Sequence, residues 1–171
     1  VVSDDDLLRA RLVNVPGAST PPNDGPGSIS YGWDWASGNM EEGTWNPRIT
    51  VYDNSGLTAT ETIFIGIDRT GPSLGTITVG DGSSWYDSST VTISGLITSA
   101  DDGQGSGVDY TEVSTDGVAW SATTSDSYDL TLPEGVTTVS LRAVDKIGNI
   151  GSTTQLNVQI DTSNPEEIGW I

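Results

Sequence analysis

The sequence predicts an all-β protein built from tandem antiparallel β-sandwiches. Short segments that alternate apolar and polar residues follow one another, with turn-forming residues about every 8–12 positions and no stretch of helical periodicity. A hairpin also recurs at a nearly constant spacing: Asp145 lies 92 residues after Asp53, and Asp161 lies 93 residues after Asp68. A constant spacing of this size indicates repeated modules.

The repeated hairpin is clearest in the second half of the chain. Thr138–Asp145 alternates as a strand, Asp145–Asn149 has the composition of a tight turn, and Gly151–Ile160 alternates as a second strand. The segment Gly43–Pro72 has nearly the same pattern, and each copy ends on an aspartate shortly before a proline. We therefore expect the same hairpin in two consecutive modules.

The first module is expected to contain two further strands ahead of its hairpin. Leu8–Val15 has strand character, and the Pro- and Gly-rich stretch Ala18–Ser28 marks a loop. Ile29–Trp35 alternates with its aromatic residues on one face, which is typical of a half-buried strand. Thr44–Tyr52 then begins the hairpin.

The second module is expected to be a seven-stranded antiparallel sandwich. Asp116-Gly117 is a typical hairpin dipeptide between two of its strands. Seven strands within about 90 residues match the size of such a sandwich. The predicted strands are Leu74–Val79, Thr90–Ile97, Val108–Thr115, Val118–Trp120, Tyr128–Leu132, Thr138–Asp145 and Gly151–Ile160.

The module boundaries predicted from this pattern are 1–70, 71–165 and 166–171. Nothing before Val1 corresponds to Leu74–Ile97, so the first module is expected to lack its first strands. Residues 166–171 are similar to the opening strand of a following module. We interpret the chain as a segment of a longer array. The alternative is a first module completed by strands of a neighbouring subunit, because an open sandwich leaves strand edges unpaired.

The composition excludes several classes of function. Six Lys and Arg residues against 24 Asp and Glu residues give a formal net charge of −18, so no basic surface is expected for nucleic acid or an anionic membrane. No apolar run approaches the length of a membrane helix. The chain has no His and no Cys, and its one lysine, Lys146, lies in a predicted hairpin turn. We therefore predict that the protein is not an enzyme.

Four short motifs resemble those of tandem bacterial and archaeal Ig-like repeats, whose last two strands carry Asp-x-x-Gly-Asn and Asp-x-Thr-x-Pro. The motifs are Tyr52–Gly56, Ile67–Pro72, Val144–Asn149 and Ile160–Pro165. The resemblance covers most of residues 74–165 and the last half of 1–72. The first module departs from it at Leu57, where the repeat has Asn. Residues 33–45 are also similar to polycystic-kidney-disease-type modules.

The resemblance implies tandem immunoglobulin-like sandwiches. It further implies a large secreted or surface-anchored protein, in which such repeats act as spacers, adhesion modules, S-layer building units or appendages to enzymes. These motifs specify the fold well and the function weakly.

The acidic loops favour calcium as a cofactor. Asp101, Asp102 and Asp109 bracket a glycine-rich loop of the second module. Calcium accepts about six to eight oxygen ligands with tolerant geometry, which clustered carboxylates and carbonyls can supply. The alternative interpretation is a solvated acidic loop.

A second candidate calcium site lies at the module junctions. Asp68 is expected there beside the Asp53 turn or the loop Asp81–Asp87, and an ion would stiffen the array by neutralising facing carboxylates. The alternative is structural, because tight turns favour Asp and Gly-Asn. The equivalent set at the next junction is Asp145, Asn149 and Asp161.

The aromatic residues have two expected roles. Trp33, Trp35 and Trp120 are predicted to fill sandwich cores. Trp85 and Tyr86, adjacent in a loop, are candidates for stacking on a glycan, with packing of the loop onto the sandwich as the alternative.

These observations predict a non-enzymatic structural segment of an extracellular or cell-surface protein. Its role would be that of a spacer, an adhesion module or an S-layer-type lattice module, stiffened by calcium, with neighbouring modules or identical subunits as partners. One alternative is a glycan-binding accessory module of an exported enzyme. Another is a filament subunit completed by a neighbour's β-strand.

Overall fold

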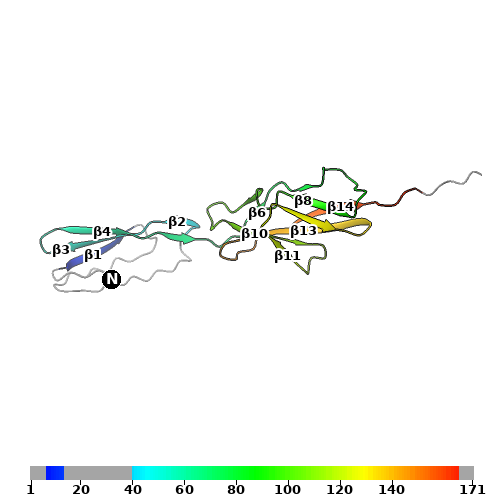
Figure 1. The fold of residues 1–171 in the computed structure, drawn as a ribbon. Helices are drawn as coiled ribbons and strands as arrows, with labels where there is room; N and C mark the ends of the chain where they lie inside the picture. Colours follow the sequence, from blue (N-terminus) through cyan, green and yellow to red (C-terminus); the bar gives the residue numbers. More distant parts are fainter. Residues whose placement is uncertain (1–6, 14–39, 166–171) are drawn as a thin grey trace, which may run out of the picture. The chain divides into compact units, whose positions relative to one another are not determined.

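A computed structural model of the protein describes residues 7–13 and 40–165, with the backbone alone for residues 7–13. The chain forms two compact units, Val1–Asp68 (unit 1) and Arg69–Ile171 (unit 2). All regular elements within the described ranges are β-strands, and all pairings between strands are antiparallel (Figure 1). The predicted all-β class is therefore confirmed. Those ranges contain no helix long and apolar enough to cross a membrane.

Unit 2 is built from a four-stranded sheet that faces a three-stranded one. The first sheet has the order β11-β10-β13-β14 and the second β12-β8-β7. A short pair, β6 (Ser73–Leu74) with β9 (Ala100–Asp101), lies beside them. The strands of the two main sheets are β7 (Thr78–Val79), β8 (Thr90–Ser94), β10 (Val108–Ser114), β11 (Ser121–Thr123), β12 (Ser127–Thr131), β13 (Gly135–Asp145) and β14 (Thr154–Ile160).

The hydrophobic core of unit 2 lies between these two sheets. On the inner strand β13, Val139, Leu141 and Ala143 are fully buried, as alternate positions facing one side of a sheet should be. Antiparallel sheets packed face to face in this strand order form an immunoglobulin-like sandwich. The core consists of Val91, Ile93, Leu96, Val113, Leu130, Leu132, Val139, Leu141, Val158 and Ile160.

The β13–β14 hairpin differs from its prediction at both strand starts. The ladder runs from the pair Gly135–Ile160 to the pair Leu141–Thr154, so β13 begins before Thr138 and β14 begins after Gly151. Gly151 instead donates its N–H to the carbonyl of Ala143. A Cβ at Gly151 would collide with the Pro72 carbonyl, so only glycine permits this close approach.

The strand predicted for the segment before β11 is misplaced. The strand expected at Val118–Trp120 lies instead at Ser121–Thr123, because Asp116 Oδ1 accepts the N–H groups of Val118 and Ala119, at 2.8 Å each, and holds them in a loop.

The prediction that Trp120 fills a sandwich core is also wrong, because Trp120 lies outside the core of unit 2. Glu112 pairs with Arg142 across β10 and β13, on the face opposite to the buried pair Val113–Leu141. The Arg142 guanidinium carbon lies 4.0 Å from the centre of the Trp120 ring, and Arg142 Nε lies 2.5 Å from Glu112 Oε2. The indole therefore packs against a cation on the outer face of the sheet.

Unit 1 contains the first copy of the hairpin. Its three-stranded sheet has the order β1 (Leu7–Val13), β3 (Arg48–Asp53), β4 (Thr58–Thr62). A two-stranded sheet pairs β2 (Gly43–Trp45) with β5 (Ile65–Ile67). The predicted strand Thr44–Tyr52 is thus divided in two, because Pro47 has no N–H for a ladder. The predictions for Ile29–Trp35, including Trp33 and Trp35, and for residues 166–171 lie outside the described residues.

The first testable prediction concerns the core strand β13. Leu141→Ala should lower the free energy of unfolding of unit 2 by about 2–5 kcal/mol, because it removes a fully buried side chain and leaves a cavity. Val136→Ala on the same strand is the control, since Val136 is 63% exposed and its change should stay within about 0.5 kcal/mol. Urea denaturation measures both, and equal effects would contradict the core assignment.

Candidate functional site

The turn after β13 is closed by the carboxylate of Asp145. Asp145 is 1% exposed, and its Oδ1 accepts the N–H groups of Ile147 at 2.9 Å and Asn149 at 2.8 Å. Its Oδ2 accepts the side-chain amide of Asn149 at 2.7 Å. Gly148 has a φ of +94°, a conformation that favours glycine. These contacts explain why the motif has Asp, Gly and Asn at this spacing.

Unit 1 repeats this turn around Asp53. Asp53 Oδ1 accepts the Leu57 N–H at 2.7 Å and the Ser55 hydroxyl at 2.8 Å. The backbone N–H of each aspartate also donates to the carbonyl four residues later, Leu57 in one unit and Asn149 in the other. Leu57 therefore supplies the same backbone groups as Asn149 and lacks only its side-chain amide.

Hydrogen bonding keeps the Asp145 carboxylate ionised. Burial raises its pKa, but bonds from the backbone and side chain of Asn149 and from the backbone of Ile147 and Gly148 outweigh that effect. The pKa of Asp145 therefore lies below its ordinary value of 3.8. Asp53 has a lowered pKa as well, because bonds from Ser55 and Leu57 outweigh its desolvation.

The loop between β9 and β10 places Asp102 differently from Asp101. Asp102 Oδ2 accepts the N–H of Gly107 at 2.7 Å, whereas its Oδ1 is buried and has no hydrogen-bond partner. Asp101 is exposed, and its Oδ1 accepts the N–H of Gly103 at 2.9 Å. A buried carboxylate oxygen without a partner costs free energy unless a cation or water satisfies it.

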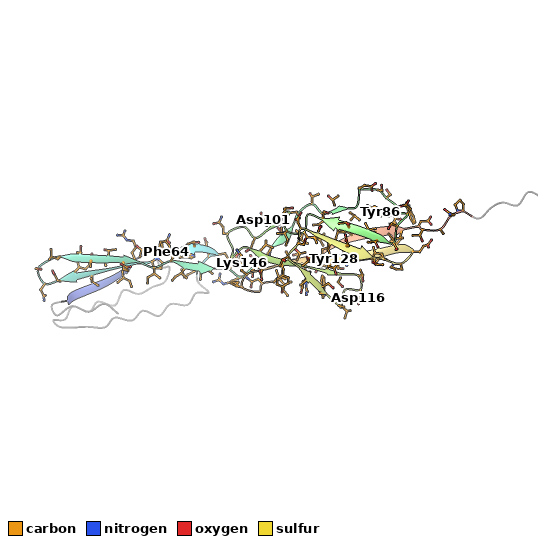
Figure 2. All side chains as sticks on the ribbon, in the orientation of Figure 1. Phe64, Tyr86, Asp101, Asp116, Tyr128 and Lys146 are labelled. Atoms are coloured by element: carbon orange, nitrogen blue, oxygen red, sulfur yellow. The ribbon has the colours of Figure 1, made fainter. Side chains whose placement is uncertain are left out.

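The β9–β10 loop and the β13–β14 turn are in contact in unit 2. The N–H of Lys146 donates to the carbonyl of Gly107 at 3.0 Å, and carboxylate oxygens of Asp102 and Asp145 lie within 4.8 Å of each other. Figure 2 shows Asp101 and Lys146 at the same end of unit 2, with Tyr86 at the other end. The sequence assigned Asp102 and Asp145 to two separate candidate sites, and the structure brings them together.

Two carboxylates at this distance repel each other, and the repulsion is largest where water is excluded. The Lys146 ammonium lies near Gly107, where an added Cβ would be 3.1 Å from it, yet Lys146 forms no ion pair within residues 40–165. The arrangement can therefore accept a further cation that prefers oxygen ligands.

Other predicted ligands lie apart from this pair. Asp109 is exposed beside an irregularity of the β10 ladder. Asp161 follows β14 and lies at the opposite end of the hairpin from Asp145, about 30 Å away along the eleven residues of β13. Within unit 1, Asp53 and Asp68 likewise lie at opposite ends of the hairpin ladder.

Trp85 and Tyr86, the two candidates for stacking on a glycan, differ in their exposure. The Tyr86 ring packs against the core, and its hydroxyl donates to the Val79 carbonyl at 2.6 Å. Burial raises the pKa of Tyr86, and the nearby Asp81 charge adds to this. Trp85 is 54% exposed and lines an open groove of about 580 Å³ with Asp81 and Asp87. Trp85 is the more exposed of the two residues, and Tyr86 lines the same groove.

Sequence reasoning missed Asp126, which organises the turn after β8. Its Oδ1 accepts the backbone N–H groups of Thr98 at 2.7 Å and Ile97 at 3.0 Å, and the Thr98 hydroxyl at 2.9 Å. These bonds, in that order of effect, lower the pKa of Asp126. They connect residues 28 and 29 positions apart, so no local motif could have indicated them.

The lowered pKa values predict loss of stability in acid. The Asp126 and Asp145 carboxylates have pKa values below 3.8 in the folded chain, so their contribution is present above that pH and is lost as the pH falls through the folded-state pKa. We expect the free energy of unfolding of unit 2, measured with urea and EDTA, to be level above about pH 5 and to fall below about pH 4. Asp126→Asn should make the free energy of unfolding fall less steeply in acid. The exposed Asp109→Asn should not, and equal slopes for both variants would contradict the assignment.

Comparisons with known proteins show only remote likeness. No protein-family model matches the sequence, and no curated protein matches it. Among solved structures, the chain is similar to fibronectin(III)-like modules of Clostridium thermocellum CbhA, with 12% identity and a TM-score of 0.41, covering 99% of this chain and 87% of that one. It is also similar to the human desmocollin-1 ectodomain, with 17% identity and a TM-score of 0.37, covering 95% of this chain and 31% of that one. The immunoglobulin-like assignment of unit 2 rests on its own strand order.

Proposed function

We propose that this chain is a non-enzymatic structural segment of an extracellular or cell-surface protein, acting as a spacer, adhesion module or S-layer-type lattice module. The observation that supports this is the repetition of one hairpin in consecutive units. Asp53 and Asp145 close the turn with the same backbone contacts, and both hairpins keep the same register between their strands. A chain that repeats a folding unit uses it to extend a scaffold.

The groups available for chemistry agree with a scaffold. The chain has no His or Cys, and its one lysine lies in the β13–β14 turn, away from any nucleophile arrangement described above. The carboxylates of Asp116, Asp126 and Asp145 each accept three hydrogen bonds, and these bonds hold turns. These carboxylates therefore stabilise turns of the fold.

Calcium binding to unit 2 forms part of this proposal. The unpartnered Oδ1 of Asp102 and the buried carboxylate of Asp145 supply anionic oxygens of the kind that calcium prefers. When bound there, the ion would offset the repulsion between the two carboxylates. It would also link the β9–β10 loop to the β13–β14 turn, which stiffens that end of the unit.

Scanning calorimetry tests the calcium proposal. Millimolar calcium should raise the Tm of the EDTA-treated chain by several degrees, because a ligand at about 100 times its Kd stabilises the folded state by about 2.7 kcal/mol. Asp102→Asn should abolish the shift, whereas the neighbouring exposed Asp101→Asn should retain it. An unchanged Tm for the unaltered chain would remove calcium from the proposal and leave the scaffold role standing.

Single-molecule extension tests the scaffold role. Unit 2, Arg69–Ile171, should resist force and then unfold in one event that lengthens the chain by about 30 nm, since an extended chain spans about 3.3–3.6 Å per residue. Leu141→Ala should lower the force of that event. Gradual extension at low force without a discrete event would contradict the scaffold role.

A further inference from the structure

Strand β4 of unit 1 is an exposed edge strand. All five of its residues, Thr58–Thr62, are exposed, and it pairs only with β3 among the described residues. Exposed apolar side chains flank it: Leu57 is 71% exposed, Ile63 39% and Phe64 76%. Within the strand itself, Glu61 is the one charge and there is no proline or lysine, the residues that usually block pairing at a sheet edge.

The hydrogen-bonding direction of β4 follows from its two ends. The N–H of Ile63 donates to the Pro47 carbonyl, and the Leu57 carbonyl accepts the N–H of Asp53. The odd-numbered residues of β4 therefore turn their backbone groups toward β3. Because this direction alternates along a strand, Thr58, Thr60 and Thr62 turn theirs toward the free edge.

The corresponding edge in unit 2 is contacted at two places by other segments of that unit. Ile150–Gly151, which follow the turn as Thr58–Ala59 do in unit 1, pack against the backbone of Gly71–Pro72 so closely that a Cβ on either Gly71 or Gly151 would collide with the other segment. Further along, the N–H of Tyr86 donates to the Gln159 carbonyl on β14 at 2.9 Å. The described part of unit 1 has no equivalent cover over β4.

We propose that β4 pairs with β4 of a second copy of this chain, antiparallel and centred on Thr60. This register places Thr58 opposite the partner's Thr62, and Thr60 opposite the partner's Thr60. The backbone groups that face the free edge then meet in pairs that exchange hydrogen bonds. The exposed Leu57 comes opposite the partner's Ile63, so the apolar residues at the strand ends cover each other.

Self-complementarity is the reason for choosing a second copy as the occupant. A two-fold axis through Thr60 brings the same patch of each copy together. Glu61 faces Ala59 of the partner subunit, so no carboxylates lie directly opposite each other. The Thr60 hydroxyl lies 3.0 Å from that of Thr50, and pairing would continue this polar row into the partner.

Disulfide trapping tests the register. The chain has no cysteine, so a Thr60→Cys variant can form a disulfide only between copies. Paired positions that exchange hydrogen bonds lie about 5.5 Å apart between Cα atoms, within the range that a disulfide spans. Thr62→Cys on the same strand is the control, because its two copies would be offset by four residues, about 13 Å. We expect Thr60→Cys to cross-link at least about tenfold faster.

Sedimentation equilibrium of the unaltered chain is the second measurement. A concentration-dependent dimer is expected, and Glu61→Gln should strengthen it about two- to threefold, because the two Glu61 carboxylates would lie diagonally about 7–8 Å apart. Glu41→Gln, which lies outside β4, should leave the dimer unchanged. A strictly monomeric chain, or equal cross-linking of the two cysteine variants, would overturn the proposal.

Discussion

The structure depends on a carboxylate that closes a tight hairpin turn. Asp145 ends β13 in a buried position and accepts three hydrogen bonds from the turn it begins, so the direction and register of β14 follow from that residue. Strand β13 in turn holds the centre of the four-stranded sheet and carries the most deeply buried part of the core. Local turn chemistry and core packing therefore favour the same arrangement.

The same carboxylate forms part of the candidate cation site of unit 2, together with Asp102. A buried aspartate satisfied by turn contacts is a stable element, but a second carboxylate with an unpartnered oxygen nearby adds repulsion. The proposed calcium ion would offset that repulsion. The proposed calcium site is thus a consequence of packing an acidic loop against an acidic turn, and the scaffold role does not depend on it.

The described parts of the two units differ in the contacts along their last strands. In unit 2 the segment around Pro72 and the Tyr86 loop pack along the edge of the final hairpin. In unit 1 the equivalent strand β4 presents threonine backbone groups and flanking apolar side chains. A free edge of this kind is either protected or paired, and its near-symmetrical sequence favours pairing with itself.

Local sequence by itself determined the all-β class, the repeated hairpin and its Asp-Gly turn, because alternation and turn chemistry act between residues close in the chain. Only the tertiary structure decided which carboxylates meet. Asp102 and Asp145 are 43 positions apart and come together because β10 pairs with β13, whereas Asp161 is carried to the other end of the same hairpin. Trp120 was misplaced and Asp126 was missed for the same reason: their partners, Arg142 and Thr98, lie on segments distant in sequence, and pairing of distant segments leaves no local pattern.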